Sequence, residues 1–537
     1  MQHHTIQNED DMSGNSPIQA RRGRTKTTAA GAALAALCLA AAAFVPVSGT
    51  THAADAMSEG MKCTNGALNG QTRSFDLHAT DGYTSEPDGN AIYDWSYTAR
   101  GSFQLPGPVL CANQGETIDV ALTDDLPVAT SIQFPGQAKV MFNDGVNASV
   151  PVGPVASPTG DLLSLVQEAP PGATVHYVFT ADHAGTYLYQ SGSDPQLQVQ
   201  MGLFGSLVIT PRSFDAGTNT WSPIVLGAAD IKAIPADDPK SSTGTSTNGD
   251  LGMTDPEASL AAGHAKCAYA SLTDPTKCDP LAIYDGEREN ILMLSEVDPG
   301  LHSFIEQHKA DAADQNGYKQ YLHWNGYHGA YQAHYYMING RSMPDTIAPN
   351  DAPWLPSQPY GALASVRPWD VHVDPLDAML RYVGVGVTGY DFHPHSNHEH
   401  VIATDGALMK AANGDNNTEE KFNLMVSPGA TLDATFRWTN EEGYRDSAGH
   451  RLPVQWPQSL NLTEGDFWSG SPYLGASGQL NPGILGKTQC GEYYHVAHSH
   501  DLTQVTNYGI TFGGMLTLIQ VQPPESVQNA TGVHCGG

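Results

Sequence analysis

Short alternating β patterns, separated by Gly, Pro and Asp turns, constrain the fold of this chain more than any other feature of its sequence. In "ETIDVALTD", Ile118, Val120 and Leu122 alternate with polar residues, so an extended strand has one apolar and one polar face. "ATVHYVFT" repeats the alternation with Val175 and Tyr177. Long helical periodicity is scarce, apart from one candidate helix in "GLHSFIEQHKADAADQ". The pattern predicts an all-β protein of the sandwich class.

The sequence also contains a weak internal repeat. "PGATVHYVF", from Pro171, recurs as "PGATLDATF", from Pro428, and each copy leads to a Gly-rich approach and a last apolar strand, "GLFGSLVI" and "FGGMLTLIQV". Two copies of one sandwich are the simplest interpretation. The expected organisation is a first domain at 54–211, a linker or insertion at 212–288, a second domain at 289–525 and a C-terminal tail at 526–537.

Two stretches depart from the repeat. The interval between the copies includes "DDPKSSTGTSTNGDLG", a polar stretch of linker composition. The second copy is the longer one, and it carries an irregular insertion around 441–488.

The N-terminus has the layout of a secretory signal. Four basic residues precede an Ala/Leu-rich run, Ala29 to Val47, and small residues follow it. We therefore expect a signal peptide at 1–53 and a secreted protein with no stable membrane association after cleavage. An uncleaved anchor is the alternative, because this run of 19 residues could just span a bilayer as a helix. The pair Arg21 and Arg22 hints at twin-arginine export, although no hydrophobic residue follows it directly.

The charge of the chain limits its partners. There are 56 Asp and Glu against 25 Lys and Arg, giving a formal net charge of -31. Such a surface repels phosphate backbones and anionic lipid head groups. Nucleic acid is therefore excluded as an expected partner, whereas a cation is favoured.

The cysteines predict disulfides. Cys38 belongs to the signal, and six cysteines remain of the seven in the chain, an even number that suits an oxidising compartment. None has a zinc-ribbon spacing. Among the fifteen connectivities that six cysteines allow, we expect the pairs Cys63–Cys111, Cys267–Cys278 and Cys490–Cys535.

Two histidine clusters indicate a metal site. "HPHSNHEH" holds four histidines in eight residues, and "YYHVAHSH" adds more; a solvated polar loop is the alternative for the first. Histidine is the commonest metal ligand. On a strand, His498 and His500 project to one face, and we expect a third ligand from the first cluster, with His398 the obvious supplier. The candidate metal ligands are His393, His395, His398, His400, His498 and His500.

Five segments then carry a resemblance to a known family. They are "PGPVLCANQGETIDVALTDDLP", "HAGTYLYQSGSDPQLQVQMGLFGSLVI", "MINGRSMPDT", "FHPHSNHEHVIATDG" and "HSHDLTQVTNYGITFGGMLTLIQV", in that order. The chain resembles the multicopper oxidase superfamily, in its laccase-like, two-domain form. The resemblance implies two cupredoxin-like domains, each a Greek-key β-sandwich or barrel, and copper as the cofactor.

The copper-ligand motifs of that family are degenerate here. In the first domain, Gln133 and Pro135 stand at the ligand positions of the first motif, and Gln190 and Gly192 at those of the second. The first domain therefore contributes none of its usual four imidazoles.

The second domain keeps part of its motifs. His393 and His398 fall on the first and third ligand positions of the third motif, while Ser396 occupies the second, and the neighbouring His395 is a substitute. In the fourth motif, His498 and His500 match, but Ser499 replaces the cysteine and Gln504 replaces the last histidine.

These departures decide the expected chemistry. A type 1 copper site needs a thiolate, which Ser499 cannot supply, and Cys490 lies too far along the strand to replace it. Direct correspondence keeps His398, His498 and His500, enough for one metal with an open coordination position; His395 or His400 would extend the set to four ligands or a loose dinuclear site. Copper is the first choice of metal and zinc the second.

Two functions follow from this set of residues. The first is a copper-dependent oxidoreductase that acts on a small molecule or metal ion directly at the residual site, without a type 1 relay. The alternative is a non-catalytic protein that binds or stores metal, or that interacts with a partner. Two-domain relatives often form trimers around shared metal; because the first domain has lost its ligands, a homotrimer is open here only through packing.

Overall fold

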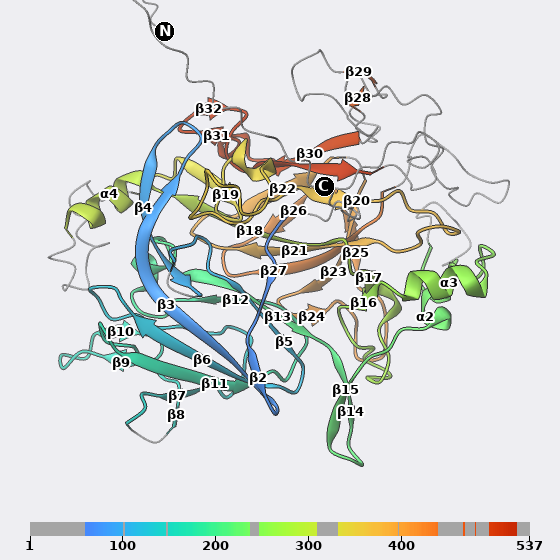
Figure 1. Cartoon of the computed structure of the whole chain (residues 1–537), viewed down its shortest axis with the longest axis horizontal. Coiled ribbons are helices and arrows are strands. Elements are labelled where there is room, and N and C mark those ends of the chain that lie inside the picture. The colour runs from blue at the N-terminus through green and yellow to red at the C-terminus, as the bar shows by residue number, and fades with distance from the viewer. Residues whose placement is uncertain are drawn as a thin grey trace, which may run out of the picture. The chain divides into compact units, whose positions relative to one another are not determined.

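The computed structural model describes residues 59–99, 102–146, 149–236, 246–308, 331–395, 397–438, 466–467, 478–479 and 493–522. The predicted signal peptide, the C-terminal tail, the predicted Cys490–Cys535 pair and nearly all of the 441–488 insertion lie outside these residues. Strands dominate the described part (Figure 1).

The first sandwich consists of two facing sheets. Its four-stranded sheet has the order β1 (Cys63–Asn65), β5 (Val109–Asn113), β13 (Phe204–Thr210), β12 (Gly185–Gln190). Its seven-stranded sheet consists of β2 (Ala67–Asn69), β3 (Thr72–Ser85), β6 (Thr117–Asp124), β11 (Thr174–Thr180), β7 (Met141–Asn143) and β8 (Val150–Pro151), with β4 (Ala91–Thr98) paired to β3.

The second sandwich has a nine-stranded and a five-stranded sheet. The nine-stranded sheet consists of β24 (Ala407–Leu408), β23 (Glu399–Thr404), β27 (Thr431–Phe436), β21 (Ala378–Gly384), β18 (Glu289–Val297), β19 (Tyr335–Ile338), β31 (Thr506–Asn507) and β32 (Ile510–Thr511), with β25 (Glu419–Lys421) paired to β23. The five-stranded sheet has the order β20 (Ala364–Val366), β33 (Leu516–Val521), β30 (Tyr493–Ser499), β22 (Tyr390–Pro394), β26 (Leu424–Val426).

Short elements complete the described chain. The two-stranded pairs are β9 (Val155–Ala156) with β10 (Leu162–Ser164), β14 (Arg212–Asp215) with β15 (Thr220–Pro223), β16 (Ala265–Cys267) with β17 (Ile283–Asp285), and β28 (Asp466–Phe467) with β29 (Gly478–Gln479). The helices are α1 (Pro195–Gln198), α2 (Ala228–Lys232), α3 (Asp255–Ala262), α4 (Pro299–Gln307) and the 3₁₀ turns η1 (Pro280–Ala282), η2 (Asp345–Ile347) and η3 (Leu502–Gln504). Helix α4 lies in the segment that the sequence favoured for a helix.

The strand pairing repeats between the sandwiches. In the first, β3 runs parallel to β6, which pairs antiparallel with β11; in the second, β18 runs parallel to β21, which pairs antiparallel with β27. Likewise β12 is antiparallel to β13, which runs parallel to β5, and β30 is antiparallel to β33, which runs parallel to β20. The two halves of the sequence repeat are thus equivalent strands, β11 and β27, of one architecture used twice.

The predicted alternation forms the core of each sandwich. Along β6, Ile118, Val120 and Leu122 are buried while their neighbours are partly exposed, and β11 shows the same pattern. Side chains of the facing four-stranded sheet, such as Leu110 and Leu207, close this core. The all-β prediction of two cupredoxin-like sandwiches is confirmed.

The two sandwiches are joined by an apolar layer and by a buried polar contact. Val109 and Leu188 of the first sandwich share a cluster with Met293 and Val383 of the second. In addition, the hydroxyl of Thr186 on β12 donates to the Asp433 carboxylate on β27, at 2.6 Å.

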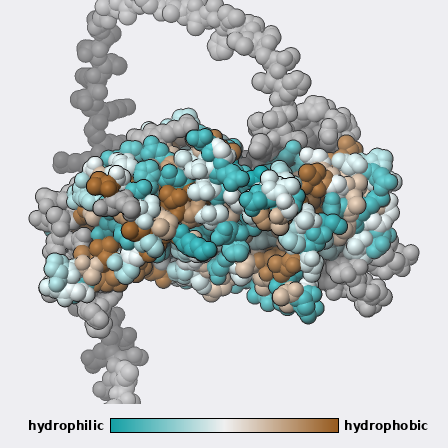
Figure 2. All heavy atoms as spheres, turned by 90° about the horizontal axis from the view of Figure 1, so that it is seen from below, coloured by the Kyte–Doolittle hydropathy of each residue, from teal (hydrophilic) through white to brown (hydrophobic). Residues whose placement is uncertain are grey.

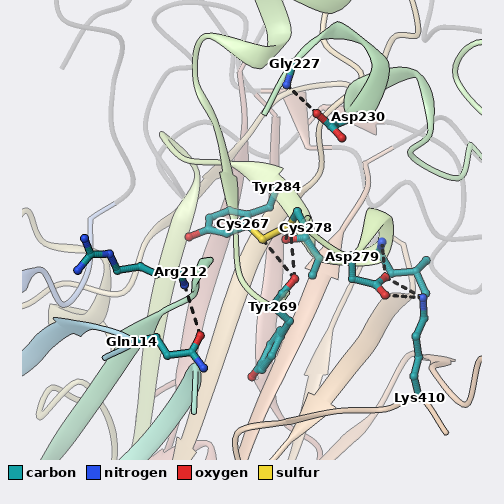
Figure 3. The surroundings of a disulfide bond; sticks show 12 residues. Gln114, Arg212, Gly227, Asp230, Cys267, Tyr269, Cys278, Asp279, Tyr284 and Lys410 are labelled. Atoms are coloured by element: carbon teal, nitrogen blue, oxygen red, sulfur yellow. Dashed lines mark hydrogen bonds and ion pairs between the residues drawn. A yellow bond between two sulfur atoms is a disulfide. The ribbon is translucent and has the colours of Figure 1, made fainter. Parts of the chain in front are cut away.

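The interval between the repeats is packed rather than extended. Side chains from α2, α3 and β17 form a cluster with Trp369, Met379 and Ile402 of the second sandwich. Figure 3 shows the Cys267–Cys278 disulfide of this interval and, beside it, Asp279, whose carboxylate accepts two bonds from the Lys410 ammonium at 2.8 and 2.7 Å. In its described parts, 212–288 is therefore an insertion with its own apolar contacts.

Two of the expected disulfides are confirmed, Cys63–Cys111 and Cys267–Cys278. Among the described residues, none of the helices has the length and apolar character needed to cross a bilayer. On the face in Figure 2, hydrophobic residues form separate small groups between hydrophilic ones.

Candidate metal centre

The register of one strand pair gathers four of the six predicted histidines. In the antiparallel pair β22–β30, His393 lies directly opposite His498. His395 follows β22 by one residue, and its backbone N–H donates to the Val496 carbonyl, so the pairing continues past the strand end. At the other end, the backbone N–H of His500 donates to the Asp391 carbonyl. Since side chains alternate along a strand, all four imidazoles project from one face of the sheet.

The four rings form a compact cluster, which we call the imidazole cluster: His393, His395, His498 and His500. The central pair, His393 and His498, has ring centroids 5.7 Å apart. His395 lies 4.7 and 5.0 Å from these two rings, and His500 lies 5.0 and 5.7 Å from them. Each outer ring therefore contacts both rings of the central pair.

Backbone carbonyls orient the central pair. Nδ1 of His393 lies 2.5 Å from the Phe422 carbonyl, and Nδ1 of His498 lies 2.7 Å from the Ser499 carbonyl. A carbonyl oxygen can only accept, so Nδ1 carries the proton in both rings and Nε2 presents a lone pair. Metal-binding histidines commonly have this arrangement, in which the second ring nitrogen donates to a carbonyl.

His395 is partly buried and contacts one ring of the central pair through a ring nitrogen. Its Nε2 lies 3.0 Å from Nε2 of His498, while its buried Nδ1 has no hydrogen-bond partner. Burial, followed by the neighbouring His498, lowers the pKa of His395 to about 3. Burial also lowers the pKa of His393 and of His498. These three rings are thus favoured in the neutral form that metal ligation requires.

The other two predicted ligands diverge because the chain changes sheets between Pro394 and Glu399. His398 is exposed and lies against the ring of Phe422, with centroids 5.7 Å apart, at the edge of the cluster. His400 belongs to β23 in the nine-stranded sheet, and its Nε2 lies 2.6 Å from the Thr418 hydroxyl. This geometry differs from the expected trio: His393 and His395, rather than His398, are the ring neighbours of His498 and His500.

Buried side chains occupy the place of the missing thiolate. Ser499 is fully buried, and its hydroxyl donates to the Gln504 side-chain carbonyl at 2.6 Å. The two residues that replace the cysteine and the last histidine of the fourth motif therefore bond to each other. The buried Met515 lies beside them, since its backbone pairs with both residues. Hydroxyl and amide donors of this kind do not make a type 1 copper site.

The corresponding positions of the first sandwich are also filled by protein contacts. Gln133 and Gln190 pair through their backbones as an isolated β-bridge. The side-chain amide of Gln133 donates to the Ser191 carbonyl at 3.2 Å, and the backbone N–H of Gly192 donates to the Ser131 hydroxyl at 3.1 Å. The structure thus brings the two degenerate motifs together, but with amide and hydroxyl groups in place of imidazoles.

The imidazole cluster fits copper in its chemistry, since it offers neutral nitrogen donors, oriented rings and one unpartnered buried nitrogen. However, the donor nitrogens of the cluster are too far apart for three of them to bind one ion. Within the described ranges, the one trio of His, Cys or carboxylate side chains whose donor atoms all lie within 4.8 Å of one another is His264, Asp285 and Glu287, elsewhere in the fold. At least one ring of the cluster would rotate to complete a three-nitrogen site.

Sequence reasoning missed the groups that orient the rings. The carbonyls of Phe422 and Ser499 belong to the backbone, so no residue pattern marks them. His393 was a candidate ligand from the sequence, but its place directly opposite His498 depends on a pairing between residues that are about a hundred positions apart, which no local pattern marks.

No family model matches the sequence. Among curated proteins, a multicopper oxidase of Cercospora beticola is 33% identical over 132 residues, which are 24% of this chain and 18% of that protein. A laccase of Aspergillus fumigatus is 31% identical over 134 residues, 24% of this chain and 19% of that protein. The match thus spans about a fifth of the length of these relatives.

Solved structures of low identity are also similar. The blue copper oxidase from Nitrosomonas europaea is 16% identical, with a TM-score of 0.43 over 85% of this chain and 87% of that one. A copper nitrite reductase from the same organism is 14% identical, with a TM-score of 0.38 over 84% of this chain and 94% of that one.

Proposed function

Because the chain is related to the multicopper oxidase superfamily, we propose that it is a secreted copper-binding protein with oxidoreductase activity at the imidazole cluster. The observation that supports this most is the orientation of His393 and His498, whose Nδ1 protons are held by carbonyls. Nε2 of His393 therefore presents a lone pair, and that of His498 becomes available once its contact with Nε2 of His395 opens. His395 and His500 supply the remaining nitrogens, and His398 lies at the edge. When bound there, copper supplies one-electron redox chemistry.

The residues around the cluster determine how a substrate reaches it. Ser499 and Gln504 are bonded to each other in the core, so no thiolate connects the surface with the cluster through this route. The imidazole cluster itself is half-buried to exposed, since His500 is exposed and the other three rings are partly so. The proposed substrate is therefore a small molecule or a metal ion that contacts the site directly.

A metal-binding role without turnover is the second candidate. It is favoured by the separation of the donor nitrogens, because the cluster lies open and binding requires a ring rotation. A storage or carrier protein tolerates such an adaptable site, whereas catalysis depends on fixed ligands.

The two candidates are separated by loading the protein with copper and measuring metal content, absorption and turnover together. The enzyme proposal expects about one copper ion per chain, no intense blue thiolate band, and copper-dependent oxidation of a phenol or of cuprous ion. Binding without oxidation supports the second candidate. The absence of bound copper contradicts both, and a blue band contradicts the loss of the type 1 site.

Export and assembly remain part of the proposal. The N-terminal segment at 1–53 is proposed to direct export, and a homotrimer, if formed, would be held by packing between chains because Gln133 and Gln190 replace metal ligands. Detection of the processed N-terminus in a culture medium, and the mass of the purified protein in solution, test these two points.

A further inference from the structure

A second group of metal-binding side chains lies away from the imidazole cluster, on the packed insertion. His264 follows α3, Asp285 ends β17, and Glu287 lies in the turn that leads into β18. Their donor atoms all lie within 4.8 Å of one another. Ligands held about 2.0–2.2 Å from one ion are separated by no more than roughly twice that distance. The limit of 4.8 Å is slightly larger than this span, so small side-chain movements would close the trio around one ion.

Backbone contacts fix this arrangement. The Gly286 N–H donates to the His264 carbonyl at 3.0 Å, and the Glu287 N–H donates to Oδ1 of Asp285 at 2.9 Å. A Cβ at Gly286 would lie 2.7 Å from the His264 carbonyl, so the close approach depends on glycine. The imidazole Nδ1 of His264 lies 3.1 Å from Asp285 Oδ1.

A buried carboxylate beside the trio has one oxygen that a cation could partner. Asp374 is 8% exposed, and its Oδ1 has no hydrogen-bond partner. It interacts electrostatically with both Asp285 and His264. An unpartnered buried carboxylate oxygen is costly, and a bound cation would remove that cost.

Two arginines, Arg367 and Arg288, act electrostatically on Asp374 and only partly balance these carboxylates. Arg367 reaches Oδ2 of Asp374 and Oε2 of Glu287, each at 3.5 Å, which is longer than the roughly 2.7–2.9 Å of a charge-assisted hydrogen bond. Its contacts leave Asp374 Oδ1 free. The side chain of Glu287 is 49% exposed and that of His264 is 27% exposed, so an ion and its waters have access from solvent.

We propose that His264, Asp285 and Glu287, with Asp374 beside them, form a second site for a divalent cation. One imidazole and several carboxylates suit a first-row ion such as Mn²⁺ or Zn²⁺. The ion ties the loop after α3, the β17–β18 turn and the Asp370–Asp374 turn together, and so stabilises the insertion against the second sandwich.

Mn²⁺ is the probe, because the oxygen-poor imidazole cluster is a weak site for it. Binding is measured as the loss of the electron paramagnetic resonance signal of the free ion. The thermal unfolding midpoint of the full chain, which the bound ion should raise, is measured as well. We expect saturable binding of about one Mn²⁺ per chain, weakened at least about tenfold in Glu287→Gln and in His264→Ala. Asp274→Asn, which removes an exposed carboxylate elsewhere on the insertion, is the matched control and binds as the wild type does.

The outcome is independent of the copper proposal. The double variant His395→Ala/His498→Ala is expected to keep its Mn²⁺ site, whatever happens to copper. Because the Glu287 side chain is exposed, Glu287→Gln is expected to fold. It therefore tests the site even if His264→Ala fails to fold. Mn²⁺ binding that is absent at millimolar concentration, or unchanged in Glu287→Gln, overturns the proposal.

Discussion

The two sandwiches share one strand architecture, yet they treat the positions of the copper motifs in opposite ways. In the first, Gln133 and Gln190 meet as a β-bridge, and their neighbours form ordinary hydrogen bonds. In the second, the β22–β30 pair places four imidazoles on one face. The scaffold alone therefore does not make a metal site: the same strand pairing accommodates either a hydrogen-bonded seam or an array of nitrogen donors.

The second sandwich itself contains both arrangements, imidazoles on one face of a strand and a hydrogen-bonded pair on the other. His498 on β30 and His500 just after it lie on the outer face, whereas on the inner face Ser499 bonds to Gln504. The strand alternation thus separates the proposed metal-binding face from a hydrogen-bonded core over three consecutive residues.

The largest expected effect is a difference in copper binding between substitutions in the second sandwich and in the first. His498→Ala removes a central ring of the imidazole cluster, and we expect copper affinity to fall by about 100-fold or more, because even hydrogen-bond partners of ligands contribute about 10–100-fold. Gln190→Ala, at a motif position of the first sandwich, is expected to bind copper as the wild type does. Equilibrium dialysis with metal analysis measures both. Equal losses in the two variants would contradict the comparison.

The next effect concerns the inner face of β30. Ser499→Ala leaves the buried Gln504 carbonyl without its donor, and we expect the free energy of unfolding to fall by about 1–3 kcal/mol with little change in copper binding. Ser303→Ala, at an exposed position on α4, is the control and should change stability by no more than about 0.5 kcal/mol. Chemical denaturation measures both variants. A large loss of bound copper in Ser499→Ala would show that copper binding on the outer face of β30 depends on the hydrogen bond on its inner face.

A smaller effect is expected in the pH dependence of stability. His395 has a pKa of about 3 in the folded chain against an ordinary 6.5, so the unfolded chain takes up this proton first as pH falls. The free energy of unfolding therefore decreases from about pH 6.5 downward towards pH 3. In His395→Gln this part of the acid sensitivity is lost, while the surface variant His372→Gln serves as control. Identical pH profiles of His395→Gln and the wild type would refute the burial of a neutral ring.

The smallest effect is predicted for the first sandwich. Gln133→Ala removes one side-chain bond to the Ser191 carbonyl and should cost about 0.5–1.5 kcal/mol of unfolding free energy, without any change in bound copper. Denaturation midpoints and metal content are measured on the same samples. Loss of copper in this variant would show that the first sandwich still takes part in metal binding.

Much of the fold was predictable because it depends on local patterns. The alternation around Val120 marks a half-buried strand by itself, and the repeated "PGAT" segments mark equivalent strands β11 and β27. The pairs Cys63–Cys111 and Cys267–Cys278 were also anticipated. The relationship to the multicopper oxidases, suggested by five segments, is confirmed by the curated matches at the level of the superfamily.

The site was harder to predict because it depends on register. Motif correspondence favoured His398, but the chain crosses from the five-stranded to the nine-stranded sheet just there, which takes His398 to the edge and His400 to a bond with Thr418. Only the pairing of His393 with His498 shows which rings meet. The trio at His264 has no motif spacing at all and arises from a tight turn at Gly286.

The most direct test is an anomalous-diffraction map of copper-soaked crystals. The account predicts a copper peak at the imidazole cluster, about 2 Å from Nε2 of His498 and from a nitrogen of His393 or His395, and none at Gln133 and Gln190. A peak that avoids the cluster, or a contact between Nε2 of His395 and Nε2 of His498 that persists in the presence of copper, would contradict it.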